Sequence, residues 1–404
     1  MVEKIKVLYK EIENLGAVNL LTIFFILMQL AGFLESATMP LGSEGYTLSY
    51  TLETWGPRFL YPAIAFLLLR NANWDSGKRL SMLSVPFAGA IMALVLQLST
   101  GTLSPAIIAA CFFVFFIDHN PPELSLGEGC KYLVCYLILP IVFLASLFLV
   151  EWMGLLPGKF HYLMDVTSNN GLFRGESFRG FARDRIAYSY LCGVALLCIL
   201  ARHEKRVADF IWMGLLLVAL SLASSRAALV ALALSLVFVF AFDKRSLRLL
   251  LAAILVVAVM ALVAASFSGR PDFLGDPGGR LTYIKSYMDT IQQKPWLLLT
   301  GERAFGANIV LEGGGMVRPH SWLLNSIINF GVLVTGCWMV FLFRFFKKLN
   351  NHGRAIVIYF TTVGLFHNGF DAYLFSIEHL IGFLLAASVG GAWKEVEDKR
   401  FLSQ

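Results

Sequence analysis

The stretch SWLLNSIINFGVLVTGCWMVFLF, residues 321–343, carries no charged side chain from its first residue to its last. A helix that crosses a membrane needs about 20 mostly apolar residues, with a range of roughly 17–25. The stretch therefore predicts a membrane-spanning helix. His320 stands directly before it, which raises the question of what a titratable ring does at the mouth of such a helix.

The composition of the whole chain agrees with a membrane protein. Of its 404 residues, 57% are hydrophobic and only 15% are charged, and the mean hydropathy is +0.69. Soluble domains carry about 25% charged residues, so we do not expect a large soluble domain. The net charge of +6 is modest, and on such a chain we interpret it as a signal of membrane topology, not of nucleic-acid binding.

The lengths of the apolar segments predict an all-α polytopic membrane protein with about twelve transmembrane helices. We expect a single transmembrane domain over residues 1–404, because no segment has the composition of a separate soluble domain. The expected spans are 17–34, 56–70, 80–98, 103–117, 131–150, 185–201, 208–223, 226–242, 249–267, 321–343, 355–374 and 376–393.

Short basic segments between these spans predict the orientation of the chain. Lys and Arg are enriched in cytoplasmic loops, and twelve spans put all of these segments on one side, which we expect to be cytoplasmic. They are the N-terminus, 70–79, 202–206, 243–248, 344–354 and 394–400. Residues 35–55 and two long loops, 151–184 and 268–319, then face the outside of the membrane.

The two long outer loops collect arginines on the side where basic residues are usually scarce. This excess predicts an anionic partner at the outer face. Within the second loop, GGRLTYIKSYMDTIQQ (278–293) has apolar residues at helical spacing. We expect this segment to be a helix lying in the membrane interface, with its polar face toward water.

Arg226 stands at the outer end of a tight hairpin between two expected spans of about 16 residues each. Such short spans put the turn at or below the headgroups, where a charge is costly without a partner. Arg226 is either an interfacial anchor that snorkels to the surface or a phosphate ligand, because guanidinium binds phosphate in a bidentate way. Arg280 follows Gly278 and Gly279, and the two arginines together make a plausible diphosphate clamp.

We expect His320 to lie on the same outer face of the membrane as these arginines. A histidine in a loop is most often solvated or hydrogen-bonded structure. Its ordinary pKa of about 6.5 also suits a group that removes a proton from an acceptor hydroxyl near neutral pH. Both interpretations stay open at this point.

A second basic cluster lies in GLFRGESFRGFARDRIAYSYL, residues 171–191. Acidic residues are interleaved with its arginines, so internal ion pairing and substrate binding are equally supported. The cluster comprises Arg174, Arg179, Arg183 and Tyr188, with Glu176 and Asp184 between them. His367 and Asp371 lie one helical turn apart near the outer end of another span, and we interpret them as hydrogen-bonding residues at a helix end.

No pattern in the chain predicts a metal site or a cofactor. His367 and Asp371 have no third ligand at fixed spacing, and the cysteines have no zinc spacing. A phosphate-binding P-loop, a dinucleotide fingerprint and an Asp-x-Asp nucleotide-sugar motif are all missing from the sequence. The donor of any transfer reaction is therefore not expected to be a soluble nucleotide.

These residues together resemble the superfamily of O-antigen ligases and O-antigen polymerases, which are bacterial membrane glycosyltransferases. His320-Ser321, followed after nine residues by Gly331, is similar to the family's histidine motif. SSRAALV around Arg226 is similar to its arginine on a tight outer turn, and GGRLTYIKSY with KPWLLLTGERAFG resembles the segments before the histidine. Two positions depart from the pattern: Ser321 stands where the family often has Asn, and Val334 where ligases tend to have a small residue or Tyr.

The resemblance implies a GT-C-type, inverting, metal-independent enzyme in the bacterial inner membrane, with its active site on the periplasmic side. The donor would be a glycan on undecaprenyl diphosphate, and no cofactor is implied. Arg226 and Arg280 would hold the diphosphate, and His320 would orient or deprotonate the acceptor hydroxyl. Further substrate binding is expected from the outer arginines Arg174, Arg179, Arg183, Arg303 and Arg318.

The acceptor separates the two branches of the superfamily. A polymerase adds the glycan to another lipid-linked repeat, whereas a ligase adds it to the lipid A core. SFRGFARDRIAYSYL resembles an arginine-Gly-Phe stretch of polymerases, which favours that branch slightly. A transporter or flippase of lipid-linked glycans is the alternative outside enzymes, but the expected spans lack the ionisable residues near the bilayer midplane that such proteins use.

Overall fold

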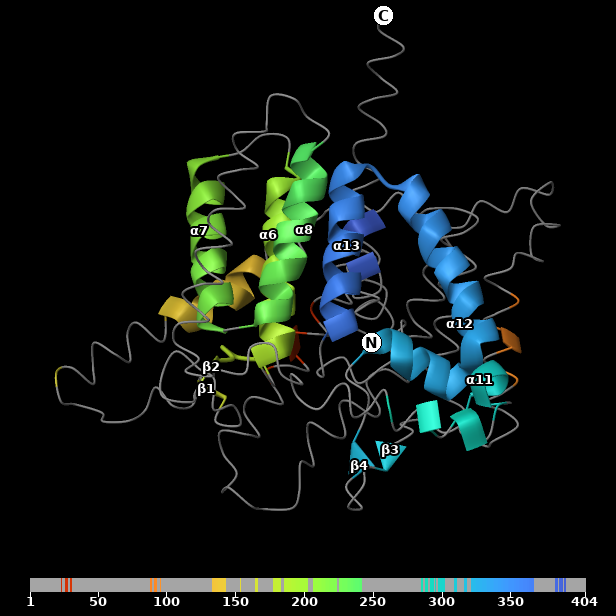
Figure 1. Ribbon diagram of the computed structural model, residues 1–404. Coiled ribbons are helices and arrows are strands. Elements are labelled where there is room, and N and C mark those ends of the chain that lie inside the picture. The colour runs from red at the N-terminus through yellow and green to blue at the C-terminus, as the bar shows by residue number, and fades with distance from the viewer. Residues whose placement is uncertain are drawn as a thin grey trace, which may run out of the picture.

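Figure 1 shows the computed structural model of the chain, whose described part is helical apart from four strands of two residues each. The described residues are 23, 26–27, 30, 88, 91–92, 95, 133–142, 153, 164–165, 177–182, 185–202, 206–223, 225–241, 285, 288–289, 291–293, 295, 297–301, 309–310, 316–317, 321–366, 382–383, 385–387 and 389. A predominantly helical chain was predicted, and this coarse class is confirmed for the described residues.

The longer helices of the described part follow the apolar segments of the sequence. The elements are the helix Leu133–Val142, β1 Met164–Asp165, β2 Ser177–Phe178, α6 Arg185–Leu200, α7 Val207–Leu222, α8 Arg226–Ala241, α11 Leu297–Thr300, β3 Ile309–Val310, β4 Met316–Val317, α12 Trp322–Lys348 and α13 Asn351–Phe366. Both pairs of strands, β1 with β2 and β3 with β4, are antiparallel.

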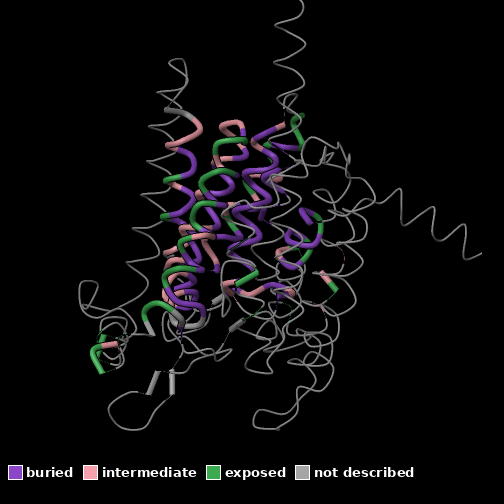
Figure 2. The backbone as a smooth tube through the Cα atoms, turned by 90° about the vertical axis from the view of Figure 1, so that its right-hand side faces the viewer, coloured by how far each residue is buried: buried purple, intermediate pink, exposed green. Residues whose placement is uncertain are grey.

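Helices α6, α7, α8 and α13 stand side by side, with α6 and α8 running from the lower to the upper part of Figure 1 and α7 and α13 running the opposite way. α13 packs against both α8 and α6, and α6 packs against α7. The connection from α6 to α7 and that from α12 to α13 lie at the top of Figure 1, which we call the upper end. The turn between α7 and α8, strands β1 to β4 and the start of α12 lie at the opposite, lower end. Figure 2 shows the buried residues concentrated along the helices, which together enclose one core.

Close approach between α6 and α13 explains part of this packing. The Tyr359 hydroxyl donates a hydrogen bond of 3.0 Å to the carbonyl of Ser189, and both side chains are fully buried. The Tyr359 ring lies directly over Gly193, where a Cβ atom would collide with it. Glycine is thus required at residue 193 so that the tyrosine can reach the main chain of α6.

Helix α12 is broken, which differs from the single span predicted over residues 321–343. Gly331 has φ 76° and ψ 174°, a conformation that is essentially restricted to glycine. A first limb, residues 322–330, runs across the lower end, and the second limb rises along the bundle (Figure 1). The rings of Phe330 and Trp338 pack edge to face across the break, with centroids 5.0 Å apart. Hydropathy alone did not predict this break, because the residues on both sides of it are apolar.

The segment 344–354 was predicted as a cytoplasmic loop, but most of it is helical. α12 continues to Lys348, and α13 begins at Asn351. Arg354 explains how the two helices come so close, because its guanidinium donates to the carbonyls of Phe346 at 3.0 Å and Lys347 at 3.2 Å. These carbonyls belong to the last turn of α12, where the i+4 N–H groups of the helix are missing; the Phe346 carbonyl also accepts the Leu349 N–H at 3.3 Å.

Asn350 completes this junction at the start of α13. Its side-chain oxygen accepts the backbone N–H of Gly353 at 2.8 Å, which is the usual arrangement of an N-cap. Two residues, Leu349 and Asn350, are therefore sufficient to join α12 to α13.

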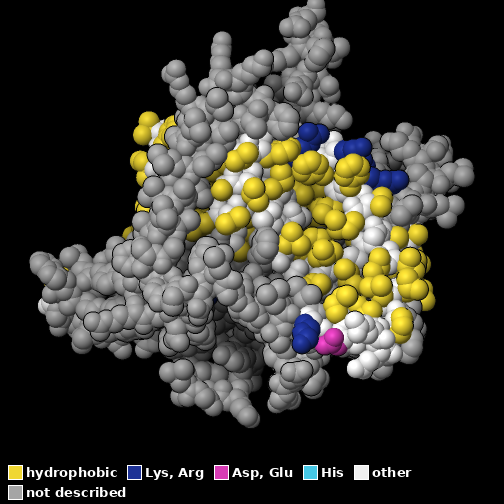
Figure 3. Space-filling model, in the orientation of Figure 1, with side chains coloured by type: hydrophobic (Ala, Val, Ile, Leu, Met, Phe, Trp, Pro, Cys, Tyr) yellow, Lys and Arg dark blue, Asp and Glu magenta, His cyan; other side chains and the backbone are white. Residues whose placement is uncertain are grey.

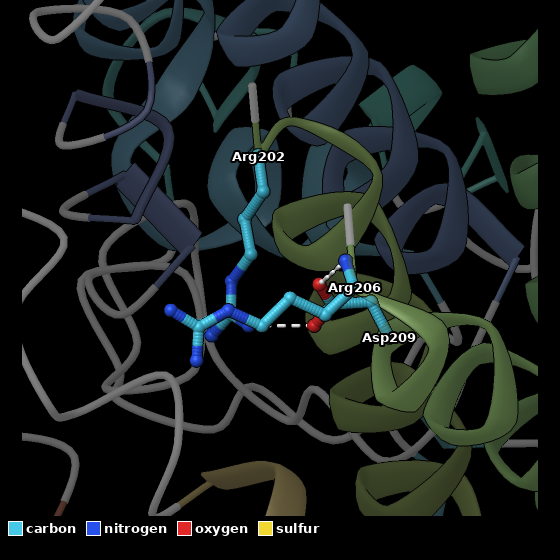
Figure 4. A network of polar contacts seen from close by, with 3 residues as sticks. All are labelled: Arg202, Arg206 and Asp209. Atoms are coloured by element: carbon cyan, nitrogen blue, oxygen red, sulfur yellow. Dashed lines mark hydrogen bonds and ion pairs between the residues drawn. The ribbon is translucent and has the colours of Figure 1, made fainter. Parts of the chain in front are cut away.

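The other connection at the upper end is held by an ion pair (Figure 4). Asp209, in the first turn of α7, is 3% exposed and accepts a hydrogen bond of 2.7 Å from the Arg202 guanidinium. Its second carboxylate oxygen accepts the backbone N–H of Arg206 at 2.9 Å. A carboxylate in the first turn also interacts favourably with the helix dipole. The pair therefore fixes the angle at which the chain leaves α6 and enters α7.

Apolar side chains cover much of the outer surface of the bundle. In Figure 3 they spread over the face in view; basic side chains lie near its upper edge, and one further basic side chain lies beside an acidic one at its lower edge. Exposed large apolar residues occur on α7, α8 and α12, among them Phe210, Val230 and Phe343. An exposed apolar surface that covers several neighbouring helices marks a face that contacts a membrane or another protein.

One described helix, Phe330–Lys348, is long and apolar enough to cross a membrane, with 19 residues and a mean hydropathy of 1.5. Four further apolar helices of the described part are shorter, at 10–17 residues: Leu133–Val142, Arg185–Leu200, Val207–Leu222 and Ala227–Val239. A 16-residue helix is about 24 Å long, somewhat less than the roughly 30 Å of a hydrocarbon core.

Candidate functional site

Two of the eight predicted site residues belong to the part of the chain that the structure describes. They are Arg179, which is half-buried, and Arg226, whose backbone is placed. Outside the described residues lie Arg174, Arg183, Arg280, Arg303, Arg318 and His320, together with His367 and Asp371. The described part of the candidate site therefore consists of Arg179, Arg226 and the residues that are close in sequence to the other predicted site residues.

Arg179 opens a tight turn directly after β2. The backbone N–H of Ala182 donates to the Arg179 carbonyl at 3.1 Å, which closes the turn over Gly180 and Phe181. Gly180 has φ 57°, which side chains other than glycine rarely adopt. β2 itself pairs with β1, with Phe178 opposite Met164. The turn thus follows from the RGF stretch of the sequence.

Two buried tyrosines hold this turn against the helices. Tyr136, from the helix Leu133–Val142, donates its hydroxyl to the Phe181 carbonyl at 2.6 Å. Tyr188, from α6, packs edge to face on Phe178 with ring centroids 5.2 Å apart. A Cβ atom on Gly180 would lie 2.5 Å from the Tyr188 ring, so the glycine allows close contact. The backbone that carries Arg179 is clamped between two helices.

Tyr188 was predicted to have either a functional or a structural role. Its side chain is fully buried, and its hydroxyl donates to the carbonyl of Leu137 at 2.5 Å. This bond joins α6 to the helix Leu133–Val142, from which Tyr136 reaches the turn. The structural role accounts for its burial and for the use of its hydroxyl.

Arg226 is the first residue of α8, at the tight turn that the sequence predicted. Ser225 precedes it and is buried; its carbonyl accepts the N–H of Leu229 at 3.1 Å, and its hydroxyl accepts that of Ala228 at a longer 3.4 Å. α7 ends at Leu222, so only three residues join the two helices. The first turn of a helix attracts anions, and an arginine there adds a group that binds phosphate.

Arg179 and Arg226 lie at the same end of the bundle. β2 contacts α7, the helix whose lower end leads directly into the Arg226 turn, and Figure 1 places both turns at the lower end. This pair was predicted to share the outer face, and the fold brings their backbones to one end. Arg202 and Arg206 lie at the other end, 16 residues of α7 away from the Arg226 turn.

The start of α12 adds a further anchored position to the lower end. Ser321 is buried, and the Trp322 indole donates its N–H to the carbonyl of Thr361 in α13 at 2.9 Å. β4 ends at Val317, so only residues 318–320 join the hairpin to this anchor.

The segment before the hairpin is helical at every described position from Lys285 to Gln293. A helix was predicted over 278–293, and helical structure is confirmed at residues 285, 288–289 and 291–293. Its placement in a membrane interface stays a prediction. The short α11 follows and packs against α12; it ends at Thr300, and Gly301 directly after it has a φ of 70°.

Metal ligands do not gather in the described residues. No group of three or more His, Cys, Asp or Glu side chains comes together there. The described cysteines Cys135, Cys192, Cys198 and Cys337 are free thiols. The described part of the lower end contains Arg179 and the first turn of α8, and both arginine and helix N-termini are groups that bind anions in proteins.

Sequence reasoning missed Tyr136 and Trp322. Each contact links residues far apart in the chain, 45 positions for Tyr136 with Phe181 and 39 for Trp322 with Thr361, and no local pattern marks either. Gly180 carried a usable signal, because arginine-Gly-Phe is a turn sequence.

Comparison with known proteins adds no assignment to these observations. No protein-family model matches the chain. No curated protein matches it either.

Proposed function

We propose that the chain is a membrane glycosyltransferase that elongates a bacterial surface polysaccharide at the periplasmic face of the inner membrane. One observation carries the proposal: the backbones of Arg179 and Arg226 are set on two tight turns at one end of the helical bundle. Arginine is suited to binding a diphosphate, which is the leaving group of a polyprenyl-linked sugar donor.

The proposed reaction transfers a glycan from undecaprenyl diphosphate to a sugar hydroxyl. The acceptor oxygen attacks the anomeric carbon of the donor while the bond from that carbon to the diphosphate oxygen breaks. The acceptor proton passes to His320, and the electron pair leaves with undecaprenyl diphosphate. Arg226 and Arg280 stabilise the charge that develops on the leaving group, an effect of about 3–4 kcal/mol per well-placed donor.

The remaining outer arginines are proposed to bind the sugar chains and the diphosphate during this step. They are Arg174, Arg179, Arg183, Arg303 and Arg318.

The twelve-span arrangement belongs to the same proposal, with the upper end in the cytoplasm and the lower end in the periplasm. It is supported by the exposed apolar surface of α7, α8 and α12 and by basic residues near the upper edge of Figure 3.

The proposal takes the polymerase form because the Arg179 turn is made from the arginine-Gly-Phe stretch that resembles polymerases. A ligase would use the same donor and the same diphosphate site. It would differ in the acceptor, which would be the lipid A core in place of a second lipid-linked repeat. The two forms therefore make different products and are separated by analysis of those products.

The test uses the native bacterium with the gene deleted and complemented by the wild-type gene or by His320→Ala. Lipopolysaccharide is separated on a gel, and lipid-linked glycan is assayed in parallel. Cores that carry one repeat, without long lipid-linked chains, support the polymerase. Bare cores with long chains stranded on the lipid indicate the ligase, and an unchanged glycan profile in the deletion strain contradicts the proposal.

A further inference from the structure

We propose that Tyr136 is a positioning residue for Arg179, and that the clamped turn binds an anionic group of the lipid-linked donor. The inference rests on the proposed function and adds a residue that no sequence pattern indicated. Tyr136 comes from a helix 45 positions away in the chain and touches the turn through its hydroxyl.

The bond joins the Tyr136 hydroxyl to the carbonyl of Phe181, two residues after Arg179. Within the turn, the Ala182 N–H donates to the Arg179 carbonyl. One such bond does not define an orientation relative to the helices. The Tyr136 bond supplies this orientation, because it ties the middle of the turn to a helix whose inner residues are buried, Leu133 and Leu137 among them.

The opposite side of the turn is fixed by packing. Gly180 lies against the Tyr188 ring, and that ring also packs on Phe178. The Tyr188 hydroxyl in turn bonds to Leu137, one residue along from Tyr136. The turn, α6 and the helix Leu133–Val142 thus form a closed set of contacts around the backbone of Arg179.

This amount of buried structure under a loop arginine is more than a solvated surface turn needs. A guanidinium that binds phosphate oxygens in a bidentate way gains from a fixed backbone, because less side-chain and loop freedom is lost when the ligand binds. Tyr136 would therefore act on donor binding through Arg179, without touching the donor itself.

A double-mutant cycle tests the inference with purified full-length protein and an undecaprenyl-diphosphate-linked glycan as the donor. Arg179→Gln should raise the donor KM by roughly 10-fold or more, since hydrogen bonds to charged groups contribute that much. Tyr136→Phe, which removes only the hydroxyl, should raise it by roughly 3- to 10-fold. With both changes present, the donor KM should equal that of Arg179→Gln within about twofold, because the effect of Tyr136 passes through Arg179.

Tyr359→Phe is the matched control. It also removes a buried phenol hydroxyl that donates to a main-chain carbonyl, at Ser189, but this bond lies between α6 and α13. The donor KM of this variant should stay within about twofold of wild type, even if its stability falls as much as that of Tyr136→Phe.

Gly180→Ala approaches the same turn from its other side, and it serves if Tyr136→Phe does not fold. The added methyl meets the Tyr188 ring and is strained at φ 57°. It should also raise the donor KM, and again without further effect in the Arg179→Gln background.

The inference would be overturned if Tyr136→Phe raised the donor KM by the same factor in the wild-type and Arg179→Gln backgrounds. It would also be overturned if Tyr359→Phe raised the donor KM as much as Tyr136→Phe does. If the wild-type protein transfers glycan and Tyr136→Phe has an unchanged donor KM, this inference is overturned but the proposed function is not. Absence of transfer by the folded wild-type protein would instead contradict the proposed function, and this inference with it.

Discussion

The two ends of the helical bundle use arginine in different ways. At the upper end, arginine side chains hold the fold: Arg202 pairs with buried Asp209, and Arg354 caps the last turn of α12. At the lower end, neutral side chains hold the backbone, as Tyr136 and Trp322 each donate to a main-chain carbonyl. The comparison separates an end whose described connections are held by arginine from an end whose described anchors are neutral tyrosine and tryptophan side chains.

The largest expected effect is on the rate of glycan transfer, and it is seen by comparing alanine variants of two arginines at the starts of neighbouring helices. Arg206 stands just before α7 at the upper end, and Arg226 opens α8 at the lower end. Arg226→Ala should lower glycan transfer by about 100- to 1000-fold, because it removes charge stabilisation of the leaving diphosphate. Arg206→Ala should leave transfer within about twofold, because the Arg206 side chain is exposed and its contact with Asp209 is made by the backbone.

Rates measured on equal amounts of folded protein check this comparison. Equal losses in the two variants would remove the distinction between the ends.

Asp209→Ala addresses the upper end and should act on stability alone. It removes both carboxylate contacts, and we expect a loss of about 2–3 kcal/mol in the free energy of unfolding. The value stays below that of a fully buried pair because the Arg202 side chain is 33% exposed. Asp209→Asn keeps an oxygen that can accept one of the two bonds, so its loss should be smaller.

Unfolding in mixed detergent micelles measures this change. Transfer per folded molecule should remain at the wild-type level, and a loss of transfer in the folded Asp209→Ala protein would show that the upper end takes part in the reaction.

Gly331→Ala tests the break in α12 that carries the chain into the lower end. A residue with a side chain at φ 76° and ψ 174° is strained by about 1–3 kcal/mol, so the variant should lose roughly 2 kcal/mol of stability. Gly336→Ala lies five residues on in the same helix, where an added methyl meets nothing within 4 Å. That control should be neutral or should gain up to about 1 kcal/mol. If the two variants unfold alike in mixed micelles, the break does not depend on glycine.

Trp322→Phe has the smallest expected effect on stability. It keeps an aromatic ring but loses the bond to Thr361, which should cost about 1 kcal/mol. Because Ser321 and His320 directly precede this anchor, transfer should also fall several-fold. The unfolding midpoint and the transfer rate measured on one preparation check both parts, and a change in stability with normal transfer would limit Trp322 to a structural role.

Helix positions were the most predictable feature of the chain. α6, α7 and α8 match the predicted spans 185–201, 208–223 and 226–242 within about a residue at each end. The reason is local: uninterrupted apolar residues end at Arg202 and begin again after Arg206, and Ser225 opens α8. Such helix boundaries can be predicted because they depend on residues that are adjacent in the sequence.

Contacts between distant residues were not predictable in the same way. The break at Gly331 depends on a backbone conformation. It was not predicted because the apolar residues continue on both sides of the glycine. The Arg354 cap turned an expected loop into helix through bonds to residues seven and eight positions earlier. For the candidate site, the tight turn before Arg226 was predicted from the sequence, whereas the turn at Arg179 and the buried tyrosines that clamp it were not.

Reconstituted transfer is the most direct test of the central claim. Purified wild-type protein and His320→Ala, both shown to be folded, are placed in lipid vesicles with an undecaprenyl-diphosphate-linked glycan that serves as donor and acceptor. The account predicts longer lipid-linked chains and free undecaprenyl diphosphate with the wild type, and at least a 100-fold slower reaction with His320→Ala. An unchanged donor in the presence of folded wild-type protein, or equal rates for the two proteins, would contradict it.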